Sequence, residues 1–89
     1  PGASVLGKVT VGIHDNALLV PEQSVVRRPA GEVGYVINGA SAQQRVVRTG
    51  LHYEGRIEII EGLAAGKIIA VDGAGFLTDN APVIVQGNS

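Results

Sequence analysis

The sequence predicts an all-β protein, a small antiparallel β-barrel or β-roll of seven to eight short strands with at most one short helical turn. Three observations support this fold class. β-Branched residues fall in short runs, 13 glycines spread over 89 residues separate these runs, and no segment of about ten or more residues keeps a helical period. Because short strands with open edges tend to aggregate, a closed barrel or roll is favoured over an open sheet.

The composition indicates one small folded domain and excludes several classes of function. Apolar residues make up 45% of the chain and charged residues 17%, so the chain can collapse around a core. The formal net charge of −1 argues against binding to nucleic acid or to anionic membranes, which attract basic surfaces. The chain has no cysteine, which excludes disulfides and thiolate metal sites. No apolar stretch approaches the roughly 18–20 residues of a membrane span, and the opening Pro1-Gly2 is interpreted as a cut inside a longer chain.

The first predicted element is a half-buried strand that ends at Asp15-Asn16. Its apolar residues share one side of an extended chain, while Lys8 and Thr10 point the other way. Asp and Asn break the strand because their side chains compete for backbone hydrogen bonds. The apolar side consists of Val5, Val9, Val11 and Ile13.

A second short strand, Ala17–Val20, ends at a proline. A proline at the first helical position, followed by Glu22, predicts one helical turn over Pro21–Ser24. The chain then becomes extended again at Val25-Val26, and Arg27–Gly31 is expected to be an exposed loop.

Two hairpins are predicted in the middle of the chain. Asn38-Gly39 follows an alternating run and is a strong signal for a type I′ turn, with a returning strand at 42–49. Glu54-Gly55 is a weaker signal of the same kind. It leads into a strand in which Ile57 and Ile59 face inward.

The last third of the chain contains two further predicted strands. Residues 62–66 form a turn, and Lys67–Val71 is a buried strand. A compact irregular segment over 73–80 leads to a closing strand at Val83–Val85, which begins after a proline, where a strand tolerates it.

Segment 62–67 has glycines and a lysine that invite comparison with a phosphate-binding P-loop. It is one residue too short, and Ile68 stands where that motif has a serine or threonine for magnesium. We therefore interpret it as a β-turn followed by a strand. Glu58 and Glu61 lie on one strand and are expected to point to opposite faces, so they do not form an acid and base pair.

The chain offers few candidates for catalysis or metal binding. His14 and His52 are the only imidazoles, and with Asp15 or Glu54 beside them they could hold a metal, but their spacing matches no known ligand pattern. Ser24 with His14 and Asp15 has the residue types of a nucleophilic triad, without the strained turn that presents the serine. The sequence therefore predicts no enzyme, no catalytic or metal site and no cofactor.

Arginines form the one concentration of positive charge. Arg27 and Arg28 lie in the predicted loop, and Arg45 and Arg48 lie on the strand after Asn38-Gly39. One interpretation is a solvated edge strand, because charges there block unwanted pairing. The other is a polar docking surface for another protein, where arginine is enriched.

The order of several short blocks resembles the C-terminal portion of periplasmic adaptor proteins, also called membrane fusion proteins, of RND-type tripartite efflux pumps. Leu18–Val26 resembles the Val-Pro-x-x-Ala-Val segment of that family, and Pro1–Val5 resembles the run that opens the last strand of its preceding barrel. The other matching blocks, in family order, are Gly34–Gly39, Arg45–Gly50, Arg56–Gly66, Ile69–Gly73 and Leu77–Val83. Lys67, where an acid is common, and Asn80, where glycine is usual, depart from the pattern.

The resemblance implies a structural role and two segments. Residues 1–16 would be the last strand of the adaptor β-barrel, and 17–89 the C-terminal part of a membrane-proximal β-roll. The full-length adaptor would be anchored to the inner membrane and lie in the periplasm. It would contact an inner-membrane RND exporter and neighbouring adaptors, and reach an outer-membrane channel through its other domains. The sequence does not distinguish between drugs, dyes and metals as the exported substrate.

Two other hypotheses remain. An adaptor of an ABC-type exporter shares this β architecture, and the neighbouring gene would separate the two. A free-standing small-molecule or metal-binding β-barrel using His14 and His52 is the third, and a zinc or copper titration tests it. Under the first hypothesis, charge reversal at Arg27 and Arg28 is expected to weaken pump assembly without unfolding the domain.

Overall fold

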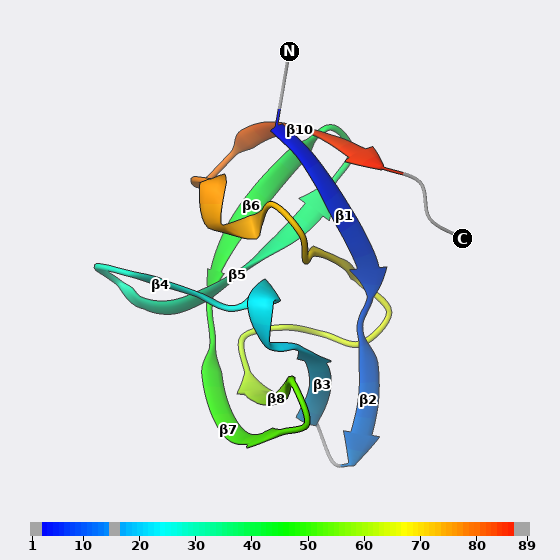
Figure 1. Cartoon of the computed structure of the whole chain (residues 1–89), viewed down its shortest axis with the longest axis vertical. Helices are drawn as coiled ribbons and strands as arrows, with labels where there is room; N and C mark the ends of the chain where they lie inside the picture. Colours follow the sequence, from blue (N-terminus) through cyan, green and yellow to red (C-terminus); the bar gives the residue numbers. More distant parts are fainter. Residues whose placement is uncertain (1–2, 15–16, 87–89) are drawn as a thin grey trace.

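The structure is a computed structural model that describes residues 3–14 and 17–86. Its first sheet joins six strands in the order β4-β5-β6-β10-β1-β9. A further pairing between β5 and β9 closes five of these strands into a barrel (Figure 1). The strands are β1 (Ala3–Val9), β4 (Val26–Arg28), β5 (Gly31–Asn38), β6 (Ser41–Val46), β9 (Ile68–Ala70) and β10 (Ala81–Gln86).

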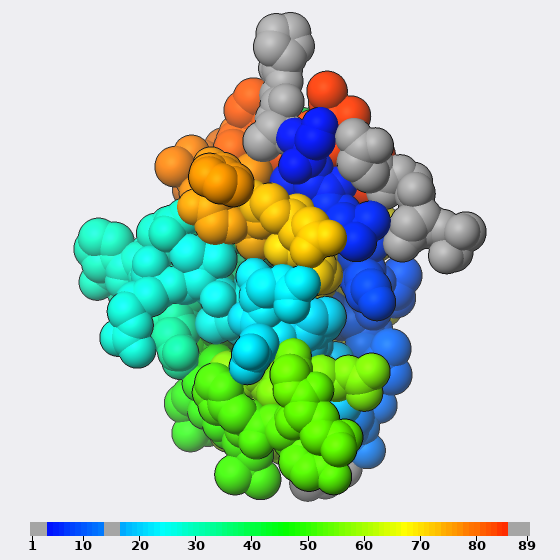
Figure 2. All heavy atoms as spheres, in the orientation of Figure 1, coloured from blue at the N-terminus to red at the C-terminus, as the bar shows by residue number. Residues whose placement is uncertain are grey.

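The second sheet lies below the barrel in Figure 1 and has the order β2-β3-β8-β7. Two turns of 3-10 helix, η1 (Glu22–Ser24) and η2 (Ala74–Phe76), connect strands. In the space-filling view, η1 (cyan) lies between the hairpin of β7 and β8 (green) and the segment that contains η2 (yellow to orange) (Figure 2). The strands of this sheet are β2 (Val11–His14), β3 (Ala17–Pro21), β7 (Arg48–Tyr53) and β8 (Arg56–Glu61).

The predicted all-β class and the barrel are confirmed, with some differences in detail. The described residues contain ten strands rather than seven or eight, because breaks at Thr10 and Val47 each divide an expected strand in two. Part of the expected loop 27–31 pairs with β5 as strand β4. The pairing of β1 with β10 is parallel. A second helical turn, η2, lies in the segment expected to be irregular. None of the helical segments in the described ranges is long and apolar enough to span a membrane.

The expected apolar side of the first strand is only partly correct. Val5 is buried, but Thr10 is also buried, with 3% of its surface exposed. The Thr10 hydroxyl donates to the carbonyl of Ala64 at 2.7 Å and accepts from the Lys67 amide at 3.1 Å. These bonds satisfy a buried hydroxyl and interrupt the strand, so the alternation changes beyond it. The side chains left exposed are those of Val9, Val11 and Ile13.

Both predicted hairpins form, and the first is shifted by one residue. Asn38 pairs with Ser41, so the loop is Gly39-Ala40 rather than Asn38-Gly39. Only Gly39 has a positive φ, of 65°, which is the pattern of a type II′ turn with glycine at its first central position. In the second hairpin Glu54 and Gly55 have φ of 52° and 79°, as the expected type I′ turn requires.

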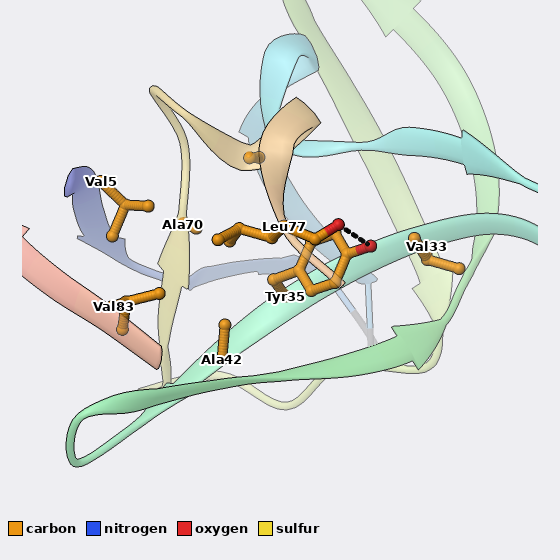
Figure 3. Close-up of a cluster of buried hydrophobic side chains, with 8 residues drawn as sticks. Val5, Val33, Tyr35, Ala42, Ala70, Leu77 and Val83 are labelled. Atoms are coloured by element: carbon orange, nitrogen blue, oxygen red, sulfur yellow. Dashed lines mark hydrogen bonds between the residues drawn. The ribbon is translucent and has the colours of Figure 1, made fainter. Parts of the chain in front are cut away.

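The core has two clusters of apolar side chains. The first fills the barrel around Tyr35, which is fully buried, and the Tyr35 hydroxyl lies 3.0 Å from the carbonyl oxygen of Leu77 (Figure 3). The second lies between the two sheets, where Ile57 and Ile59 face inward as predicted, at 2% and 1% exposure. The remaining buried members of the second cluster are Leu18, Val20, Val47, Ile69 and Val71.

Candidate functional site

Arg28, one of the four predicted contact residues, is tied into the fold. Its Nε donates to the Tyr35 hydroxyl at 3.2 Å, and its Nη2 donates to the carbonyls of Gly75 and Leu77, each at 3.0 Å. The guanidinium therefore joins β4 to the segment around η2. Much of its hydrogen-bonding capacity is already used inside the chain.

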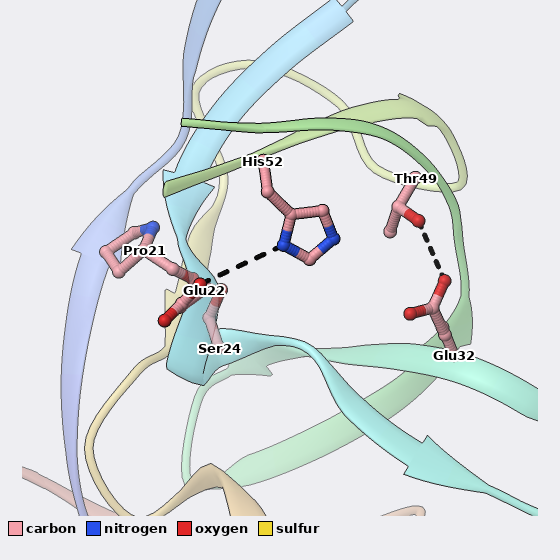
Figure 4. Close-up of polar contacts among 6 residues, drawn as sticks. All are labelled: Pro21, Glu22, Ser24, Glu32, Thr49 and His52. Atoms are coloured by element: carbon pink, nitrogen blue, oxygen red, sulfur yellow. Dashed lines mark hydrogen bonds and ion pairs between the residues drawn. The ribbon is translucent and has the colours of Figure 1, made fainter. Parts of the chain in front are cut away.

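Arg27, on the same strand, is exposed and lies opposite Glu32 of β5. Its side chain forms no hydrogen bond or ion pair with the described residues. The Glu32 carboxylate accepts a hydrogen bond from the Thr49 hydroxyl at 2.8 Å (Figure 4). Arg27 thus has an exposed side chain, and the carboxylate of the residue opposite it in the ladder accepts from Thr49.

Arg48, at the start of β7, forms an ion pair with Glu61 across the β7–β8 ladder. Its Nε lies 3.3 Å from Glu61 Oε1, and about two thirds of each side chain is exposed, at 63% and 69%. An ion pair this accessible to solvent contributes at most about 1 kcal/mol, so a partner could compete for either charge.

Arg45 lines a cavity of about 490 Å³, which none of the other three arginines lines. Its Nη2 donates to Gln43 Oε1 at 2.7 Å, on the same face of β6. Lys67 also lines this cavity, and sequence reasoning did not select it. Two signals were present: Lys67 ends the segment that was compared with a P-loop, and it stands where the family commonly has an acid. The remaining lining residues are Val36, Ile37, Asn38, Gln43, Gly62, Leu63 and Ala64.

The segment 62–67 is a turn followed by strand β9, which agrees with the interpretation that it is no P-loop. Gly62 and Gly66 have φ of 110° and 85°. Gly62 has no room for a side chain, because an added Cβ would lie 2.8 Å from the Cα of Val47. The amide of Gly66 donates to the Thr10 carbonyl at 3.1 Å, which holds the turn against the break between β1 and β2.

The residues considered for a metal site or a triad have other contacts where they are described. His52 Nδ1 lies 3.9 Å from Glu22 Oε2, and the Ser24 hydroxyl donates to the Pro21 carbonyl at 2.6 Å (Figure 4 shows these residues). Asp15 and the side chain of His14 lie outside the described residues, as does Pro1-Gly2. Within the described ranges, no group of three or more His, Asp or Glu side chains is placed to hold a metal ion.

A second cavity, of about 300 Å³, lies beside β1, β2 and β3. It is lined by the exposed side chains of Val9, Val11 and Ile13, with Lys8 and Arg56 among its polar residues. Each cavity has two cations among its lining residues, but only the first also has the polar side chains of Asn38 and Gln43 beside them.

Taken together, the fold is a small closed β-barrel with an attached four-stranded sheet, and its surface offers two open cavities and exposed arginines. The family model of the C-terminal permuted SH3 domain of RND membrane fusion proteins matches residues 16–75. The chain belongs to this family of RND membrane fusion proteins, as the resemblance predicted.

Two relatives illustrate the similarity. The chain is 30% identical over 82 residues to the multidrug resistance protein MdtA of Erwinia amylovora, which covers 91% of this chain and 20% of that protein. It is 31% identical over 75 residues to the multidrug efflux pump subunit AcrA of Escherichia coli K12, covering 82% of this chain and 19% of that protein. The chain thus spans about a fifth of the length of the curated relatives it matches. No solved structure matches it.

Proposed function

We propose that the chain is the membrane-proximal part of a periplasmic adaptor in an RND-type efflux pump. The observation that carries this proposal is the match of the family model over residues 16–75. The names of the relatives, a multidrug resistance protein and a multidrug efflux pump subunit, support a role in export. In this proposal the adaptor links an inner-membrane RND exporter to an outer-membrane channel and performs no catalysis.

The full-length protein would lie in the periplasm, anchored to the inner membrane. Its partners would be the exporter, neighbouring copies of the adaptor and, through its other domains, the channel; it would need no cofactor. Co-purification of the full-length protein with an RND exporter is the expected result. Co-purification with an ABC-type exporter alone would overturn the proposal and favour the alternative adaptor class.

The arginines are proposed to contribute to the contact with the exporter. Arg27 and Arg45 are exposed, so Arg27→Glu and Arg45→Glu in the full-length adaptor are expected to reduce co-purification and drug resistance. Arg56→Glu is the matched control, because Arg56 is exposed on a different sheet. Arg48→Glu would place a second acid opposite Glu61, and Arg28→Glu would remove the hydrogen bonds that join β4 to the segment around η2. The free energy of unfolding therefore has to be measured for both variants together with assembly. Unchanged assembly in the variants of all four arginines would mean that none of them contributes to the exporter contact.

The proposal includes the division into 1–16, the last strand of the adaptor barrel, and 17–89, the C-terminal part of the membrane-proximal roll. The start of the family match at residue 16 supports this boundary. In this chain β1 also pairs with β10, with Ser4 opposite Ile84. Since the chain has no cysteine, a Ser4→Cys/Ile84→Cys pair can test the boundary in the full-length protein. Little cross-linking is expected if residues 1–16 belong to the barrel domain, and efficient cross-linking would place β1 in the roll.

A further inference from the structure

We propose that the cavity between the β5–β6 hairpin and the turn at 62–67 binds a carboxylate side chain of a partner protein, from a segment in which acidic and apolar residues alternate. This inference rests on the proposed function, because it names a docking site through which an adaptor would hold another protein. The residues of this site come from the β5–β6 hairpin and the turn at 62–67, which are distant in the sequence and lie together only in the folded chain.

The outward face of the β5–β6 hairpin forms one wall of the cavity. Val36 lies opposite Gln43, and Gly34 lies opposite Arg45. Because Gly34 has no side chain, Leu63 of the neighbouring turn lies over this position, with its Cδ1 3.5 Å from where a Cβ would be. The result is an apolar floor of Val36 and Leu63 with polar side chains around it.

The rim of the cavity carries two positive charges, Arg45 and Lys67. Among the residues that the structure describes, no Asp or Glu lines it. The Arg45 guanidinium donates from Nη2 to Gln43 Oε1 at 2.7 Å and from Nη1 to the Gln44 carbonyl at 3.4 Å, which uses two of its five donors and orients the rest. The Lys67 ammonium forms no hydrogen bond or ion pair with the described residues. Two uncompensated cations at one opening favour a carboxylate, which can accept from both.

The apolar floor and the size of the cavity select the kind of ligand. A volume of about 490 Å³ has room for a carboxylate side chain and an apolar neighbour. Arg45, Lys67 and Asn38 are all exposed, so the opening faces solvent and suits a segment presented from outside. A protein segment with acidic and apolar residues in alternation matches both the rim and the floor by charge and by polarity.

The test is a titration of the 15N-labelled chain with a blocked peptide in which glutamates alternate with leucines, followed by NMR. The amides of residues 36–45 and 62–67 are expected to shift, and binding is expected to weaken as salt is raised. Arg45→Gln and Lys67→Gln should each weaken binding by roughly two- to fivefold, which corresponds to at most about 1 kcal/mol for a charged contact at a solvent-exposed site. Arg56→Gln removes the same charge outside the cavity and should leave binding unchanged.

Four results would overturn the inference. The glutamine version of the peptide could bind equally well, the shifts could map away from the cavity, or Arg56→Gln could weaken binding as much as Arg45→Gln. Butyrate is the probe for a free carboxylate; if it shifts the same amides as strongly as the peptide, the site takes small anions and the protein partner is refuted. Peptide binding without co-purification of an RND exporter would support the site and refute the proposed function. Co-purification of an RND exporter without peptide binding would support the proposed function and refute the site.

Discussion

Arg28 allows a sharp test of how this fold is held together, because its neighbour Arg27 is a matched control. Replacing Arg28 with alanine removes the donor to the Tyr35 hydroxyl and the two donors to the Gly75 and Leu77 carbonyls. The Leu77 carbonyl keeps the Tyr35 hydroxyl as a neighbour at 3.0 Å, and solvent can reach the Gly75 carbonyl, which reduces the loss.

The expected cost is therefore about 2 kcal/mol in the free energy of unfolding. This is less than the sum over three hydrogen bonds to a charged group, at about 1.5–3 kcal/mol each, because these bonds are only partly buried or exposed. For a domain of this size that corresponds to a fall in Tm of roughly 8–16 °C. Arg27→Ala should change the free energy by no more than about 0.5 kcal/mol, as exposed substitutions usually do. Arg28→Lys keeps the charge without the planar fork and should recover only part of the loss.

The measurement is urea unfolding followed by circular dichroism, with thermal unfolding as a second readout. Equal stability of Arg28→Ala and Arg27→Ala would refute the reasoning, because it would mean that the contacts of Arg28 contribute nothing. The result also bears on function, since a loss of pump assembly in an Arg28 variant reports on the exporter contact only if the domain stays folded.

Three further changes test the core and the turn at 62–67. Ile59→Asp buries an unpaired charge in the second core cluster and should unfold the domain. Its control is Ile68→Asp, at a position that is 42% exposed, which should leave the domain folded. Circular dichroism distinguishes the two outcomes. Thr10→Val leaves the Ala64 carbonyl without its hydroxyl donor and should cost about 1–3 kcal/mol in urea unfolding; an unchanged midpoint would contradict this. Gly62→Ala places a Cβ against the Val46 carbonyl at a positive φ of 110° and should lower Tm by several degrees. Gly31→Ala is the control for the cost of the backbone conformation, because Gly31 has a similar φ of 124° and an added Cβ would meet nothing within 4 Å.

Local patterns predicted the elements that depend on a few neighbouring residues. The run Arg56–Ile60 alternates, so its isoleucines face the core in any sheet that buries one face. Glu54-Gly55 adopts the expected turn because positive φ at both positions is a local requirement. Asn80, which stands where the family usually has glycine, has a left-handed conformation with φ of 64°, which asparagine tolerates better than most residues. The ordered blocks of sequence also identified the family without reference to any contact.

What only the tertiary structure decided depends on residues far apart in the chain. Thr10 is buried because a turn more than fifty residues later supplies its hydrogen-bond partners, and alternation alone predicted the opposite. Arg28 differs from Arg27 because η2 returns to contact its guanidinium, which no local pattern contains. Lys67 and Arg45 line the same cavity because β9, which begins directly after Lys67, pairs with β5. Sequence patterns report periods and turns along the chain, whereas these pairings arise from closing the barrel, and closure is a property of the whole fold.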